Sequence, residues 1–127
     1  MKIPKFEAQT EWVKPTEFPE LRDVDEIAID LETKDPDLIK KGSGSVIGNG
    51  EVIGIAVATS FYKGYFPIAH EGGGNMDRSR VLAWLKDILE SPSTKVFHNA
   101  IYDVCWLRAM GFKINGDIAC TMIAAAL

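Results

Sequence analysis

The sequence predicts one α/β domain in which helices flank a mixed β-sheet. Three observations indicate this: the chain has 127 residues, 46% of them are hydrophobic, and its apolar residues change between strand and helix periodicity. The order that results is strand, strand, strand, helix, strand, helix, with one more helix at the end. A helical crossover lets the fourth strand return parallel to an earlier one, so the sheet is expected to be mixed.

The strands follow from alternating apolar residues and from runs of Val and Ile. Pro67 places the third strand at an edge of the sheet or near the end of that strand. The stretch 34–50 between the first two strands is polar and glycine-rich, which predicts a mobile loop. The predicted strands are residues 24–31, 51–59, 65–69 and 95–98.

Three helices follow from apolar spacing and from end signals. Asp77 is a suitable N-cap for the first helix, which must end before Pro92. The second covers residues 99–110, and Gly111 stands where a left-handed C-terminal residue is expected. The turn that follows lets Asp117 cap a third helix that continues to the end of the chain.

Composition excludes several function classes. The chain has 14 basic and 18 acidic residues, a net charge of −4, whereas proteins that coat nucleic-acid phosphates carry the opposite sign. A nucleic-acid role must therefore depend on a local site or on bound cations. The sequence has neither a membrane-length apolar run nor a signal-peptide core. Cys105 and Cys120 lie in apolar runs without metal-site spacing, which predicts buried thiols and a cytoplasmic location with no membrane partner.

The N-terminal residues differ in pattern from the rest. Residues 1–23 alternate short apolar anchors with prolines, which is typical of an extended arm laid over a domain surface. Residues 24–127 are then the domain itself.

A first candidate site lies at the end of the first predicted strand. Asp30 and Glu32 are two residues apart, so both point to the face opposite the apolar residues. Two neighbouring carboxylates are costly unless a cation lies between them, and hard ions such as Mg²⁺ take carboxylate oxygens. The alternative is a strand end whose acids simply reach water.

A second candidate lies on the second helix. Asn99 and Asp103 are four residues apart and share a helix face. If the fourth strand runs parallel to the first, Asp103 comes close to Asp30 and Glu32 at the sheet edge where open α/β sheets bind ligands. The alternative is a capping Asn99 and a solvated Asp103.

An apolar strand ending Asp-x-Glu and a helix carrying Asn-x-x-x-Asp, in this element order, resemble the DEDD-type 3′–5′ exonucleases of the ribonuclease H-like fold. Most similar is the proofreading domain of family A DNA polymerases, particularly those of phages. Residues 65–70 and 117–122 also resemble that family's third strand and the start of its next helix. The resemblance covers residues 24–127.

The resemblance implies a metal-dependent 3′–5′ exonuclease that acts on the single-stranded 3′ end of DNA. Two divalent ions, Mg²⁺ or Mn²⁺, are implied as cofactors, a polymerase domain as the partner in the full-length protein, and the host cytoplasm as the location. The implied catalytic residues and metal ligands are Asp30, Glu32 and Asp103. The implied substrate-binding residues are Thr33, Asn99 and Tyr102.

One motif of that family is missing. Its Tyr-x-x-x-Asp or His-x-x-x-Asp supplies a fourth carboxylate, and no Tyr or His in this sequence has Asp four residues later. We expect the motif after Leu127, so that this chain is a C-terminally truncated domain with little or no activity alone. Two alternatives remain: a ribonuclease D-like exoribonuclease, because the acids do not distinguish the sugar, and a non-catalytic nucleic-acid-binding module on the same fold.

Overall fold

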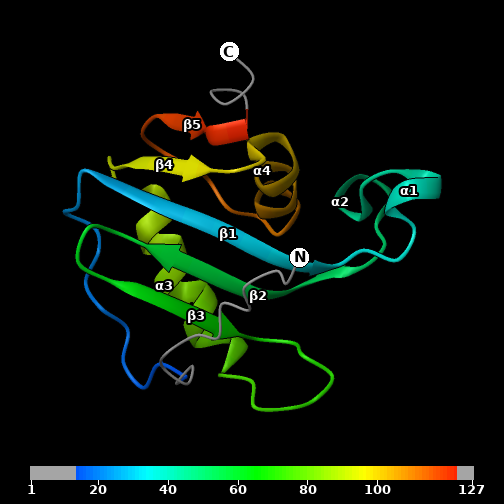
Figure 1. Cartoon of the computed structure of the whole chain (residues 1–127), viewed down its shortest axis with the longest axis horizontal. Helices are drawn as coiled ribbons and strands as arrows, with labels where there is room; N and C mark the ends of the chain where they lie inside the picture. Colours follow the sequence, from blue (N-terminus) through cyan, green and yellow to red (C-terminus); the bar gives the residue numbers. More distant parts are fainter. Residues whose placement is uncertain (1–13, 123–127) are drawn as a thin grey trace, which may run out of the picture.

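The computed structural model describes residues 14–122, which form one mixed sheet with strand order β3-β2-β1-β4-β5 (Figure 1). Strand β1 pairs antiparallel with β2, and β2 with β3, whereas β1–β4 and β4–β5 are parallel. The predicted mixed α/β sheet is therefore confirmed. The strands are β1 (Glu26–Lys34), β2 (Glu51–Ala58), β3 (Lys63–Pro67), β4 (Thr94–Phe97) and β5 (Ile118–Cys120).

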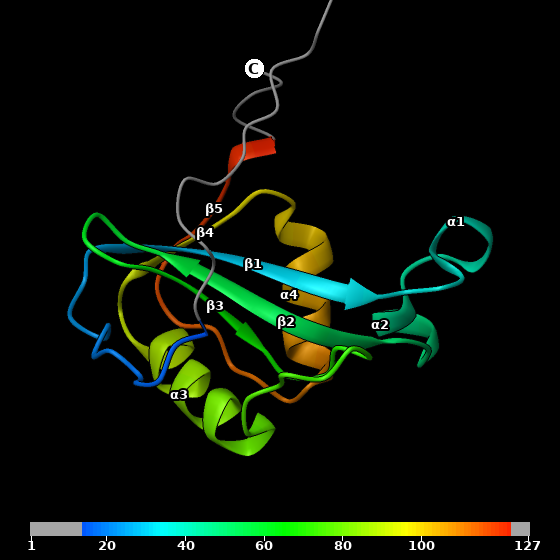
Figure 2. The same ribbon diagram turned by 60° about the horizontal axis from the view of Figure 1, so that its bottom comes forward.

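Alternation along β1 divides the sheet into a buried and an open face. Ile27, Ile29 and Leu31 are at most 8% exposed, whereas Asp30 and Glu32 are exposed. Helices α3 (Arg78–Glu90) and α4 (Ala100–Ala109) both lie on the buried side (Figure 2). The two acids of β1 are therefore on the face that the helices of the described residues leave open.

Local signals at the helix ends agree with the sequence. The Asp77 side chain accepts a hydrogen bond from the Arg80 N–H at 3.2 Å and so caps α3. Gly111, the second residue after the end of α4, has φ +93°, a left-handed conformation that favours glycine. Pro67 is the last residue of the edge strand β3, as predicted.

Residues just before β1 pack on the buried face of the sheet. Leu21 is 1% exposed, and the Phe18 ring lies 5.9 Å from Phe66 and 5.7 Å from Trp84. The Trp84 Nε1–H donates to the Pro19 carbonyl at 2.8 Å. Residues 1–13 of the predicted arm lie outside the described residues.

The stretch between β1 and β2, predicted as a mobile loop, contains two one-turn helices, α1 (Leu38–Lys41) and α2 (Gly44–Ile47). They project beyond the end of the sheet (Figure 1). The Asp35 carboxylate holds α2 by accepting hydrogen bonds from the Gly44 N–H at 3.0 and 3.1 Å. A Cβ at Gly44 would lie 1.8 Å from the Asn49 carbonyl oxygen, so this close turn requires glycine.

The prediction that a helix starts at Asp117 is wrong for its first residues. Ile118–Cys120 form strand β5, and the Lys95 N–H donates to the Asp117 carbonyl at 2.8 Å. Pairing with β4 satisfies the backbone hydrogen bonds of this short apolar segment. The spacing of apolar residues along the sequence does not reveal that partner. The described chain becomes helical only at Thr121, and the rest of the predicted helix lies outside the described residues.

Two further expectations concern burial and membranes. Cys105 and Cys120 are half-buried and do not form a disulfide, so the expectation of fully buried thiols is wrong. None of the helices within residues 14–122 combines the length and the apolarity that crossing a membrane requires.

Candidate active site

The site begins where β1 separates from β4. The last residue of β1 that pairs with β4 is Ala28. The Thr94 N–H donates to the Asp25 carbonyl, so the backbone groups of Asp25 point towards β4. Every second residue of a strand points its backbone groups the same way, so the N–H of Leu31 also points to the β4 side. Helix α4 follows β4 into the gap, and the Leu31 N–H donates there to the carboxylate of Asp103.

Asp103 is 3% exposed, so the alternative of a solvated side chain is wrong. Burial, and to a smaller extent the neighbouring carboxylate of Asp30, raise the pKa of Asp103 to about 7. The hydrogen bond from the Leu31 N–H acts in the opposite direction. The predicted proximity of Asp103 and Asp30 is therefore present, with electrostatics that favour a proton or a cation between them.

Glu32 makes different contacts. Its half-exposed carboxylate accepts a hydrogen bond from the Tyr65 hydroxyl at 2.5 Å. The His70 Nε2 lies 2.5 Å from the same hydroxyl and 3.9 Å from Glu32 Oε2. Within the described residues, no three His, Cys, Asp or Glu side chains come close enough to form a metal-binding group. The structure thus brings Asp103 to Asp30 but directs Glu32 towards Tyr65.

Sequence reasoning did not find Tyr65 as a partner of the site. The register of β1 against β2 shifts between Glu32 and Thr33, a β-bulge that re-aims side chains at a strand end. Gly54 stands opposite Glu32, and a Cβ there would lie 1.9 Å from the Tyr65 hydroxyl. The available signal was Gly54 itself, a glycine inside a strand otherwise rich in Val and Ile. Such a glycine indicates that another group approaches the strand closely.

Thr33 and Tyr102, two predicted substrate-binding residues, contact each other. Their hydroxyl oxygens are 2.8 Å apart, and Tyr102 donates to Asp35 Oδ2 at 2.9 Å. Thr33 is then the donor to Tyr102, since each hydroxyl has one proton. Asp35 therefore connects α4 to α2, a role that no sequence pattern indicated.

Asn99 is exposed at the start of α4. Its carbonyl accepts from the Asp103 N–H at 3.1 Å, but its side chain makes no capping hydrogen bond. The capping alternative for this side chain is therefore wrong. The neighbouring His98 is exposed, with its Nδ1 3.0 Å from the Thr121 hydroxyl oxygen.

A cavity of about 630 Å³ lies on the open face of the sheet, next to the acids. Asp30, Tyr65 and His98 are among the side chains that line it, and small residues such as Ala56 and Ala58 form part of its floor. Asp30 therefore has open space beside it.

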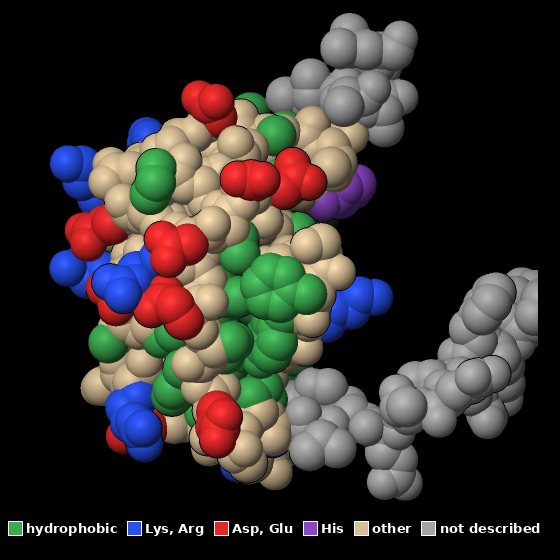
Figure 3. All heavy atoms as spheres, turned by 90° about the vertical axis from the view of Figure 1, so that its left-hand side faces the viewer, with side chains coloured by type: hydrophobic (Ala, Val, Ile, Leu, Met, Phe, Trp, Pro, Cys, Tyr) green, Lys and Arg blue, Asp and Glu red, His purple; other side chains and the backbone are tan. Residues whose placement is uncertain are grey.

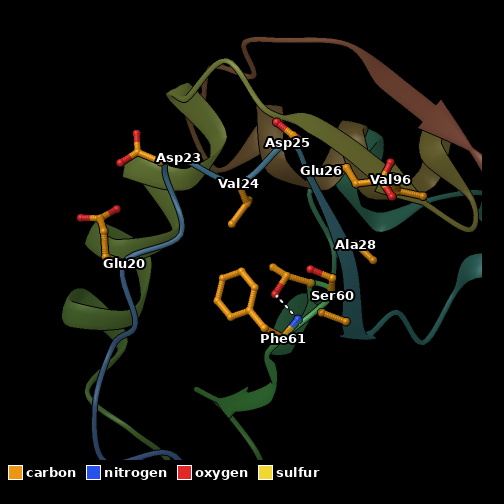
Figure 4. A pocket seen from close by; sticks show the side chains of 11 residues that line it. Glu20, Asp23, Val24, Asp25, Glu26, Ala28, Ser60, Phe61 and Val96 are labelled. Atoms are coloured by element: carbon orange, nitrogen blue, oxygen red, sulfur yellow. Dashed lines mark hydrogen bonds between the residues drawn. The ribbon is translucent and has the colours of Figure 1, made fainter.

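A cavity of about 1010 Å³ lies elsewhere, at the end of the sheet where β1 begins. On this side hydrophobic side chains gather at the centre and acidic ones lie around them (Figure 3). Phe61, Asp25 and Glu26 are among its lining residues (Figure 4). None of the six predicted site residues lines this cavity, so it is not the candidate active site despite its larger volume.

Comparison with known proteins gives a consistent result. Residues 15–127 match a family of the DNA polymerase A type that is described as 3′–5′ exonuclease. The chain is 42% identical over 116 residues to a DNA-directed DNA polymerase of Pseudomonas phage M6, which covers 84% of this chain and 17% of that protein. It is 30% identical over 112 residues to DNA polymerase DpoZ of Salmonella phage PMBT28, covering 87% of this chain and 16% of that protein.

The chain thus spans about a sixth of the length of these curated relatives. The family match covers nearly all of the described residues, including β1 and α4, which carry the acids. The fold and the family expected from the two acidic motifs are therefore confirmed, and this chain belongs to the 3′–5′ exonuclease family.

Proposed function

We propose that this exonuclease domain removes nucleotides from the 3′ ends of DNA, depends on divalent cations, and proofreads for a phage DNA polymerase. The observation that carries the proposal is the buried carboxyl of Asp103 beside Asp30. The two phage polymerases among its relatives support the polymerase context. On this proposal the partners are a polymerase domain and a single-stranded 3′ end, and the protein works in the host cytoplasm.

The acids of the site fit divalent cations in their chemistry. Asp30 and Asp103 offer only carboxylate oxygens, which Mg²⁺ and Mn²⁺ prefer, and a cation would offset the burial and the repulsion from Asp30 that raise the pKa of Asp103. Glu32 would join them as a further ligand, with its Oε2 hydrogen-bonded to Tyr65. A fourth carboxylate would come from sequence after Leu127. Two bound ions would supply an activated water and stabilise the negative charge on the leaving 3′ oxygen.

The other site residues would hold the strand. We propose that Thr33 contacts the terminal nucleotide through its backbone and that Tyr102 and the exposed amide of Asn99 orient the chain of nucleotides. Few nucleotides need to enter, so the net charge of −4 does not prevent binding. A mismatched end unpairs at lower cost than a matched one, which supplies selectivity for errors.

The test is a nuclease assay on the full-length natural protein with single-stranded DNA labelled at its 5′ end. Shortening from the 3′ end is expected with Mg²⁺ or Mn²⁺ and none with EDTA. Asp103→Asn, which keeps the side-chain size, is expected to abolish shortening. Asp87→Asn is the matched control, because Asp87 is an exposed aspartate on α3.

Full activity in the Asp103→Asn variant would overturn the assignment of the acids. An RNA strand of the same sequence distinguishes the sugars: faster shortening of RNA would replace the proofreading proposal with an exoribonuclease. Binding of DNA without shortening, in the presence of either ion, would indicate a non-catalytic binding module.

A further inference from the structure

We propose that Tyr65 and His70 are positioning residues that fix the carboxylate of Glu32 for cation binding through a chain of hydrogen bonds. This inference rests on the proposed function, in which Glu32 is a metal ligand. Neither residue would touch the ion or the substrate. Both would act by limiting the orientations of the Glu32 side chain.

The direction of the hydrogen bonds follows from the chemistry of the three groups. An ionised carboxylate only accepts, so the Tyr65 hydroxyl donates to Glu32 Oε2 at 2.5 Å. The Tyr65 oxygen can then accept from the His70 Nε2–H, which lies 2.5 Å away. A tyrosine hydroxyl is protonated at neutral pH and has one proton, which it gives to the carboxylate. Each bond polarises the next, so both donors favour one position of the carboxylate.

The sheet is built to let Tyr65 reach Glu32. Tyr65 pairs with Ala56, and Ala56 pairs with Asp30, so these three residues lie in one row across β3, β2 and β1. Glu32 lies in the next row, opposite Gly54. Because Gly54 has no side chain, the Tyr65 ring can cross diagonally to the carboxylate, where a Cβ would lie 1.9 Å from its hydroxyl.

His70 is held by its own backbone contacts. Its N–H donates to the Asn75 side-chain oxygen at 2.7 Å, and the Asn75 amide donates back to the His70 carbonyl at 2.9 Å. The preceding N–H groups of Ile68 and Ala69 donate to the Ile53 carbonyl at the β-bulge. The backbone at His70 is therefore tied to β2, and the hydrogen bond to Tyr65 is the contact that orients the imidazole.

These contacts should affect cation binding because the Glu32 side chain is 54% exposed. An exposed glutamate has many rotamers, and binding a cation in one of them costs conformational entropy. Hydrogen-bond partners that orient a metal ligand typically account for about 10–100-fold in metal affinity or activity. We expect the Tyr65 hydroxyl to contribute about tenfold to the cation affinity of the site.

The experiment measures Mn²⁺ affinity by calorimetry on the full-length natural protein. Tyr65→Phe removes the hydroxyl and keeps the ring, and is expected to weaken Mn²⁺ binding about tenfold. Tyr62→Phe is the matched control, since Tyr62 precedes the same strand and does not contact Glu32. It should bind Mn²⁺ as the natural protein does.

A double-mutant cycle separates positioning from general structural damage. In a Glu32→Ala background, Tyr65→Phe should have no further effect on Mn²⁺ affinity. His70→Ala should weaken binding, and His70→Gln should restore part of it, because its side-chain amide N–H can replace the Nε2–H. An equal loss with and without Glu32, or no loss on Tyr65→Phe, would overturn the inference.

The outcomes also separate this inference from the proposed function. If Glu32→Ala leaves Mn²⁺ affinity unchanged, the proposed role of Glu32 fails and the positioning role fails with it. If Glu32→Ala weakens binding but Tyr65→Phe does not, only the positioning role fails.

Discussion

The carboxyl group of Asp103 is buried beside Asp30, where the Leu31 N–H on the free edge of β1 donates to it. Burial, and secondly the carboxylate of Asp30, raise the pKa of Asp103 from 3.8 to about 7, although the Leu31 hydrogen bond acts in the opposite direction. The folded chain without cations therefore retains a proton on Asp103 over a pH range in which the unfolded chain has lost it.

This difference predicts how stability depends on pH. Between about pH 4 and 7 the folded state binds one more proton at Asp103 than the unfolded state, so the free energy of unfolding should fall as pH rises. Asp103→Asn should remove this slope and be more stable above pH 7, on the order of a few kcal/mol. Urea unfolding of this chain in EDTA at several pH values measures it, and an identical slope in both proteins would contradict the prediction.

Asp35 is expected to order the segment that carries α1 and α2. Its carboxylate accepts from the Tyr102 hydroxyl and from the Gly44 N–H. In Asp35→Ala, the amide protons of Val46, Ile47 and Asn49 should exchange faster, because their hydrogen bonds depend on this turn. Tyr102→Phe should have a smaller effect in the same hydrogen-exchange experiment. Unchanged protection in Asp35→Ala would show that the segment holds its structure by other contacts.

Gly54→Ala is expected to separate Tyr65 from Glu32 without unfolding the sheet. The added Cβ conflicts with the far end of the Tyr65 side chain, which can move away, so the cost in stability should lie at the low end of the range of about 1–3 kcal/mol that added core methyl groups cause. Mn²⁺ affinity should fall about as much as in Tyr65→Phe. Gly72→Ala is the control, because a Cβ at Gly72 would meet no atom within 4 Å. A Gly54→Ala protein with natural Mn²⁺ affinity would contradict this.

Asn99→Ala is expected to slow hydrolysis of a 3′ end less than Asp103→Ala does. Loss of a positioning contact misplaces the substrate, whereas loss of a metal ligand removes part of the catalytic apparatus. Because the Asn99 side chain makes no capping bond, the variant should keep its fold. Single-turnover rates in the full-length protein test the order, and a larger loss for Asn99→Ala would reverse the proposed roles.

Local patterns were sufficient to predict much of the fold. Alternating apolar residues defined β1 and placed Asp30 and Glu32 on its open face, and Asp77 marked the start of α3. The parallel pairing of β4 with β1 followed from the helical crossover, which brought Asp103 to Asp30. These features depend on periodicity, caps and chain connection, all of which are visible in a sequence.

The rest depends on tertiary contacts. Ile118–Cys120 is a strand because β4 offers it a backbone partner, and its three residues have too little pattern to distinguish strand from helix. The contact of Tyr65 with Glu32 requires the register of three strands and the space at Gly54. Helix α2 begins where the Gly44 N–H donates to Asp35, a contact between residues nine positions apart that no local pattern reveals.

On the proposed function, the acids of β1 and α4 bind divalent cations together. Calorimetry of the full-length natural protein with Mn²⁺ tests it most directly, comparing Asp30→Ala and Glu32→Ala with the exposed control Asp87→Ala. We predict strongly weakened binding in both of the first two variants and natural binding in the control. Unchanged Mn²⁺ binding in both Asp30→Ala and Glu32→Ala would contradict the account.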